Sequence, residues 1–128
     1  MDQQDDANRA RAVAHFAEVR AIRAAREQMW PETEREGVAA LHRLFAIAQS
    51  DTGQSKRIAR FLLGLYNSAR FPFALDDLRG LDYAIQDDIL ALLKMDMTCK
   101  REVHRYIDNG GVKFEALASE WGWNSDAG

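Results

Sequence analysis

The chain has 128 residues, a formal net charge of −3 at pH 7, 47% hydrophobic residues and 29% charged residues. This length fits one domain with a single core, and this balance of apolar and charged residues excludes an intrinsically disordered chain. A single cysteine excludes an intramolecular disulfide framework and is typical of a reducing compartment. The polar, acidic start of the chain lacks the features of a secretory signal, and no run reaches the ~20 apolar residues that span a bilayer. We therefore expect a cytoplasmic, single-domain protein over residues 1–128 with no membrane partner.

The first part of the chain predicts two helices separated by a proline. Residues 1–6 are polar and acidic, and we expect them to be disordered. Residues 7–29 are rich in alanine, arginine and glutamate, which are strong helix formers, although their large apolar side chains form only a narrow stripe. The dipeptide Trp30-Pro31 should end this helix, because proline disfavours helix at the residue before it. A strongly amphipathic helix is expected at 32–49, where apolar residues recur every three or four positions.

The rest of the chain, after a turn that contains Gly53, also predicts helices, because no segment alternates with period two for long enough to indicate a strand. Asn109-Gly110-Gly111 should separate the last two helices, and residues 124–128 should be disordered. The helices are expected at residues 55–68, 81–97, 99–108 and 112–121. The prediction is an all-α, compact bundle of five or six helices with a core formed by 32–49, 55–68 and 81–97.

Charge is segregated along the chain. Residues 7–30 carry five arginines against two glutamates, a net charge of +3. Residues 52–75 carry four cations and no acid, and residues 76–96 carry six aspartates against one arginine and one lysine, a net charge of −4. Two interpretations stay open: the segments pair with each other or face solvent in a self-complementary fold, or at least one of them docks a binding partner.

The docking interpretation names three sets of candidate residues. The candidate acidic face consists of Asp76, Asp77, Asp82, Asp87 and Asp88. The candidate basic face consists of Arg20, Arg23, Lys56, Arg57 and Arg60. Trp123 follows the last expected helix and is the candidate aromatic anchor, because tryptophan is favoured at interfaces.

Catalytic and metal-binding constellations are not recognisable. Cys99 and His104 lie five residues apart, which on a helix turns them about 140° away from each other, so they do not form a nucleophile and base. His104 and Asp108 could share a helix face, but two ligands do not make a zinc site. The acidic residues have the same geometric problem, since Asp82 and Asp87 are also five apart. We expect no catalytic residues, no metal and no cofactor, and an enzyme with an atypical acidic site is the third alternative.

The segment 44–63 resembles a helix-turn-helix in outline. A small residue, a turn with Gly53 and an apolar Ile58 follow at nearly the spacing of that motif, with the glycine one position late. The helix after the turn offers few polar side chains to reach base edges in a major groove. A nucleic-acid-binding transcriptional regulator that uses 44–63 and the arginines near the start of the chain is the second alternative.

A set of motifs resembles a known family. The motifs are Leu44-Phe45-Ala46-Ile47-Ala48-Gln49-Ser50-Asp51-Thr52-Gly53-Gln54-Ser55, then Phe61-Leu62-Leu63, Leu81-Asp82-Tyr83-Ala84-Ile85-Gln86-Asp87-Asp88, Phe114-Glu115-Ala116-Leu117 and Trp121. Over about 38–121 the chain is similar to an uncharacterised family of small proteobacterial proteins carried on plasmids and integrative elements, although Leu65-Tyr66-Asn67 stands where that family has tryptophan. The resemblance implies no activity and no catalytic residue. It favours a non-enzymatic protein of a mobile genetic element that binds a host or element-encoded protein through a charged surface, as an anti-defence inhibitor or a regulator. A homodimer through residues 7–29 is also plausible.

Overall fold

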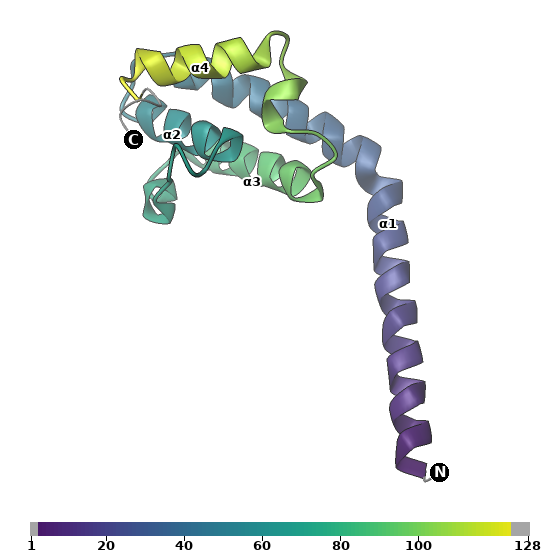
Figure 1. Cartoon of the computed structure of the whole chain (residues 1–128). Helices are drawn as coiled ribbons and strands as arrows, with labels where there is room; N and C mark the ends of the chain where they lie inside the picture. Colours follow the sequence, from purple (N-terminus) through teal and green to yellow (C-terminus); the bar gives the residue numbers. More distant parts are fainter. Residues whose placement is uncertain (1–2, 124–128) are drawn as a thin grey trace. The chain divides into compact units, whose positions relative to one another are not determined.

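A computed structural model describes residues 3–123, and these form helices and loops without a strand. Four α-helices and two short 3₁₀ helices follow one another along this part of the chain (Figure 1). They are α1 (Gln3–Ala48), α2 (Ser55–Tyr66), η1 (Leu75–Leu78), α3 (Tyr83–Thr98), η2 (Val103–Tyr106) and α4 (Gly110–Glu120). The all-α class is confirmed, whereas the expected count of five or six helices is wrong.

The predicted break at Trp30-Pro31 is the main error. A single helix, α1, includes Pro31, and it begins at Gln3, so the expected disorder of residues 3–6 is also wrong. Proline lacks the N–H that would bond to the carbonyl four residues before it, but its fixed φ is compatible with a helix. Helix-forming residues on both sides of Pro31 therefore keep the helix continuous. The contacts nevertheless divide the chain into two compact units, of which the first ends at Glu32 and the second begins at Thr33.

The other helix boundaries need smaller corrections. Helix α2 ends two residues before the predicted end of 55–68, and α3 is shifted from the predicted 81–97 because Asp82 is its N-cap. The expected helix at 99–108 is reduced to the single 3₁₀ turn η2, and α4 replaces the expected 112–121. Left-handed backbone at Cys99 (φ 53°) and Asn109 (φ 55°) explains these ends, since such residues stop or precede a helix. The expected disorder at 124–128 lies outside the described residues.

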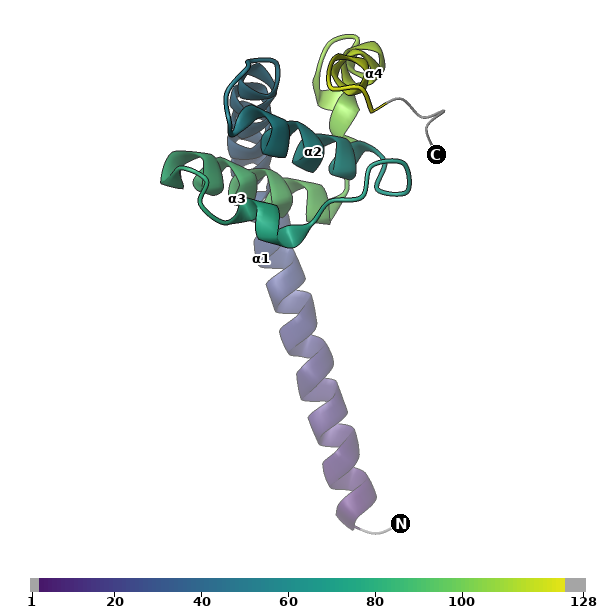
Figure 2. The same cartoon turned by 90° about the vertical axis from the view of Figure 1, so that its left-hand side faces the viewer.

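The core of the second unit is formed by the C-terminal part of α1 with α2, α3 and α4 (Figure 2). Each helix contributes fully or almost fully buried apolar side chains, among them Leu41, Leu44, Ile58, Leu62, Ile89, Leu92, Met95, Phe114 and Leu117. The rings of Phe45 and Phe114 pack with their centroids 5.3 Å apart. A Cβ on Gly37 of α1 would lie 2.6 Å from Cβ of Met95, so this glycine lets α3 approach α1 closely.

Among residues 3–123, no helix combines the length and the apolar character needed to cross a membrane.

Candidate functional site

The basic and acidic segments of the second unit contact each other. Arg57 on α2 donates from Nη1 to the backbone carbonyls of Asp77 (3.3 Å) and Arg79 (2.7 Å), at the C-terminal end of η1. Arg60, one turn further along α2, places Nη1 3.9 Å from Oδ2 of Asp77. Three residues of the two candidate faces are therefore joined within the molecule.

Two further aspartates of the candidate acidic face have partners in the fold. Asp88 accepts two hydrogen bonds from Arg43 of α1, from Nε at 3.0 Å and from Nη2 at 2.8 Å. Asp82 exchanges two bonds with Gln54: its carboxylate accepts from Nε2 at 3.0 Å, and its backbone N–H donates to Oε1 at 2.8 Å. The first contact joins α3 to α1, and the second joins the loop before α2 to the N-terminus of α3, so both stabilise the fold and reduce the charge available for docking.

Trp123 is half-buried and contacts the same cluster. The guanidinium of Arg60 lies over its ring, 5.0 Å from the centroid, and Trp121 stacks on it at 5.9 Å with an interplanar angle of 18°. The Trp121 indole N–H donates to the carbonyl of Ala48, the last residue of α1, at 3.1 Å. The two tryptophans thus fasten the end of α4 to α1 and α2, and Trp123 is not a free aromatic anchor.

The remaining candidate residues stay exposed. Lys56, Asp76 and Asp87 are exposed on the second unit, on α2, η1 and α3 respectively. Arg20 and Arg23 are exposed on the part of α1 that belongs to the first unit. The contacts between the two candidate faces all lie within residues 54–88. The first unit contains Arg20 and Arg23, whereas the other candidate basic residues belong to the second unit.

A partly exposed ion pair between Arg70, in the turn after α2, and Glu115 of α4 was not predicted from the sequence. Glu115 of α4 accepts from Arg70 Nη1 at 2.7 Å and Nη2 at 2.9 Å, and from the Tyr66 hydroxyl at 2.6 Å. The bonds from Arg70, followed by that from Tyr66, lower the pKa of Glu115 to about 2. The same contact with Glu115, together with burial, raises the pKa of Tyr66. The four-residue spacing of Tyr66 and Arg70 was the only sequence signal, and it does not identify a glutamate 45 residues away.

The residues considered for nucleophilic or metal chemistry do not assemble a site. Cys99 is exposed just after α3, and the ring of His104 packs edge-on against that of Tyr66, 5.2 Å between centroids. No group of three or more metal-ligating side chains occurs among residues 3–123. An open hollow of about 350 Å³ is lined by polar and apolar residues, including His42, Gln49, Asp108 and Lys113.

Helix α2 presents few groups to a major groove. Its residues Ile58, Phe61 and Leu62 are buried, and six residues separate its start from the end of α1, more than the three or four of a helix-turn-helix turn. Lys56 is exposed, while Arg57 and Arg60 make the internal contacts described above. The segment 44–63 therefore presents few exposed polar side chains that could contact base edges of DNA.

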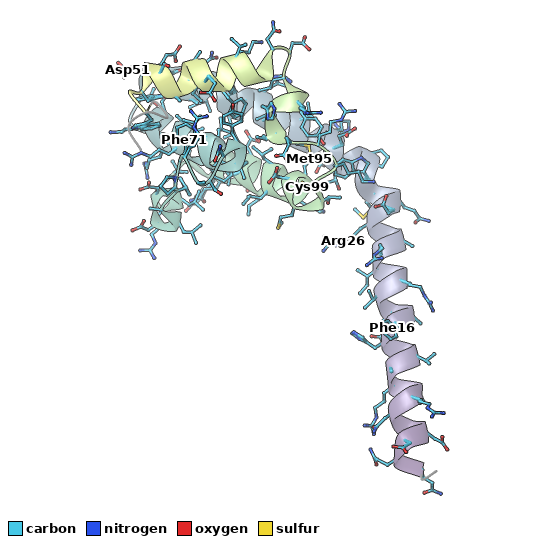
Figure 3. All side chains as sticks on the ribbon, viewed as in Figure 1. Phe16, Arg26, Asp51, Phe71, Met95 and Cys99 are labelled. Atoms are coloured by element: carbon cyan, nitrogen blue, oxygen red, sulfur yellow. The ribbon has the colours of Figure 1, made fainter. Side chains whose placement is uncertain are left out.

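Exposed apolar side chains mark two other surfaces. The Arg-rich segment, residues 7–30 of α1, exposes large apolar side chains together with its arginines: Val13, Phe16, Val19, Ile22 and Met29. Figure 3 shows Phe16 and Arg26 extending from this helix. On the second unit, α3 exposes Tyr83, Leu90 and Met97, which are spaced by seven residues. Exposed apolar groups that gather on one element are typical of interaction sites.

Comparison with known proteins gives one match. A family of unknown function, DUF7673, matches residues 38–122, which include the end of α1 and all of α2, α3 and α4. The chain belongs to this family. No curated protein and no solved structure matches the chain. The DUF7673 region starts inside α1, at residue 38, and excludes the whole Arg-rich segment, so the five arginines of that segment lie outside the part shared with the family.

Proposed function

We propose that this DUF7673 protein is a non-enzymatic interaction protein that binds an acidic protein surface through its Arg-rich segment. The observation that carries the proposal is the combination of five arginines and five exposed large apolar side chains on one helix. Residues 8–29 are exposed throughout. A helix gains most of its stability from packing of an apolar face, and a binding partner would provide that packing.

The apolar side chains favour a protein over a nucleic acid as the partner. Arginine and aromatic residues dominate the energetics of protein interfaces, where apolar groups form the dry centre and charges the rim. Phe16, Val19 and Ile22, which follow at three-residue spacing, would supply an apolar strip that spans about 120° of the helix, and Arg20 and Arg23 would lie next to it. Phosphate contacts, in contrast, need only cations and hydrogen-bond donors. The net charge of +3 on this segment selects an acidic surface.

The biological setting of the proposal comes from the resemblance to proteins of plasmids and integrative elements. A protein of a mobile element that carries a stable helical unit and one binding helix would act as an inhibitor of a host defence system or as a regulator. The contacts of the second unit leave Lys56, Asp76 and Asp87 as further exposed charges that could extend such an interface. Cofactors have no role in this mechanism.

A pair of charge-reversal variants tests the proposal. The wild-type chain is used as bait in nuclease-treated host lysate, and recovered proteins are quantified by mass spectrometry. Arg20→Glu with Arg23→Glu should reduce recovery of a stoichiometric partner at least tenfold, because both interface charges are reversed. Arg105→Glu with Lys113→Glu changes the net charge equally at exposed sites of the second unit and should leave recovery unchanged. Equal recovery by both double variants would contradict the proposal.

A nucleic-acid-binding regulator is the second candidate, because the same helix carries five arginines. It predicts affinity for a DNA or RNA duplex that falls steeply as salt rises. Phe16→Gln with Ile22→Gln discriminates the candidates, since glutamine keeps the helix while it removes the apolar centre. Loss of protein recovery with this variant supports the first candidate. The second candidate is supported if Phe16→Gln with Ile22→Gln still binds the duplex while Arg20→Glu with Arg23→Glu no longer binds it.

A further inference from the structure

Helix α3 has an outward face with a seven-residue repeat. Tyr83, Leu90 and Met97 are 85%, 64% and 74% exposed, while the opposite side of the helix is buried through Ile85, Leu92 and Met95. Seven residues make almost two full turns, so the three exposed side chains form a line along the helix. Beside this line lies a hollow of about 200 Å³, lined by Gln86 and by four apolar residues: Leu78, Ile89, Leu90 and Leu93.

Charged and polar groups flank this line in a defined order. Asp87 and Lys94 are both exposed on one flank, three residues before and four residues after Leu90. Gln86 and Leu93 occupy the other flank, four residues before and three residues after Leu90, and are half-buried. The face therefore has an apolar centre and one charged flank. Along this flank, Asp87 comes before Leu90 and Lys94 comes after it.

We propose that this face of α3 binds the same face of a second copy of the chain, with the two helices antiparallel and centred on Leu90. About a twofold axis, Leu90 meets Leu90 of the second copy, and Tyr83 meets Met97. The same operation brings Asp87 beside Lys94 and Lys94 beside Asp87, on the same flank of both helices. Gln86 and Leu93 meet in the same way on the other flank. The apolar line and the charged flank are thus both complementary to those of an identical copy.

The charge order favours this antiparallel arrangement over a parallel one. A twofold axis along two parallel helices would place the charged flank of one copy beside the Gln86 and Leu93 flank of the other, so Asp87 and Lys94 would gain no opposite charge. Only the antiparallel arrangement pairs each acid with a base. Helix α3 has 16 residues and is about 24 Å long, so the contact is small and the dimer should dissociate on dilution.

This surface is separate from the Arg-rich segment, and its test does not depend on the proposed function. Sedimentation velocity of the full chain over a range of concentrations should show a monomer–dimer equilibrium. Leu90→Asp should weaken association at least tenfold, because it places two carboxylates at the centre of the contact. The matched control is Val112→Asp on α4, where the side chain is 73% exposed and lies outside the face, and it should associate like the wild type. Circular dichroism verifies that both variants keep their helix content.

The charges give a sharper test. Asp87→Lys alone and Lys94→Asp alone each create two like-charge pairs in an antiparallel dimer, so each variant should associate more weakly than the wild type. An equimolar mixture of the two should associate again, because each copy then meets the opposite charge in the other. The double variant Asp87→Lys with Lys94→Asp should match the wild type. A monomeric wild type at all concentrations, undiminished association of Leu90→Asp, or single charge variants as strong as the wild type would overturn the proposal.

Discussion

Replacement of Glu115 by glutamine should remove the ion pair between α4 and the turn after α2 and change how stability depends on pH. The carboxylate accepts bonds from Arg70 and Tyr66 in the folded chain, and these lower the pKa of Glu115 from an ordinary 4.5 to about 2. A shift of this size corresponds nominally to about 3 kcal/mol. The side chain of Glu115 remains 45% exposed, however, and solvent screens much of the interaction, so we expect the substitution to cost about 1 kcal/mol at pH 7.

The sign of the pH dependence follows from the direction of the shift. Because the pKa of Glu115 is lower in the folded state than in the unfolded state, its contribution is complete above about pH 4.5 and is lost as the pH falls toward about 2. The difference in unfolding free energy between the wild type and Glu115→Gln should therefore shrink across this window. At pH 7 the variant should melt about 4–8 °C lower, as expected for a domain of this size.

Thermal and urea unfolding at several pH values between 2 and 7 measure this difference. Glu120→Gln removes the same charge from an exposed position of the same helix and should leave stability nearly unchanged. In the Glu115→Gln background, Arg70→Gln should have a smaller effect than in the wild type, because its partner is already absent. A stability difference that is the same at pH 2.5 and pH 7 would refute the assignment of the pKa shift to this ion pair.

Three further substitutions test the packing of the second unit. Phe114→Ala should lower the unfolding free energy by about 3–5 kcal/mol in urea denaturation, since the side chain is fully buried, and a loss below about 1 kcal/mol would contradict its central position. Gly110→Ala should lower the melting temperature because the new Cβ collides with the carbonyl of His104. The control Gly53→Ala, which has open space around it, should not, and equal melting temperatures of the two variants would contradict the close approach at Gly110. Trp121→Phe removes an indole N–H bond to the end of α1 and should cost about 1 kcal/mol, and unchanged stability would show that this bond contributes nothing.

The helical class and most of the core could be predicted because they depend on local patterns. Apolar residues at three- and four-residue spacing identify the inner faces of α2 and α3, and residues such as Ile58, Leu62 and Leu92 are buried as expected. The rule that proline ends a helix failed at Pro31, because it describes an average preference that strong helix formers on both sides overcame.

The pairing of charges could not be predicted, because it depends on how distant segments meet. Arg57 bonds to two backbone carbonyls, and no residue type in the sequence marks a carbonyl as an acceptor. Arg43 and Asp88 are 45 residues apart, so their pairing requires the packing of α3 against α1 to be known. The repeat of Tyr83, Leu90 and Met97 was visible in the sequence, but only the structure distinguishes an exposed line from a buried one.

Pro31 separates two parts of α1 whose amide protons should exchange with solvent in different ways. Pro31 has no N–H to donate to the carbonyl of residue 27, so the hydrogen-bond ladder is interrupted close to the point where the two units meet along the chain. Amides before residue 31 should exchange with solvent deuterium as the exposed helix frays. Those of residues 37–48, which include the buried positions, should exchange only when the packed unit opens. A molecule bound to the Arg-rich segment would therefore slow deuterium uptake on one side of Pro31 only.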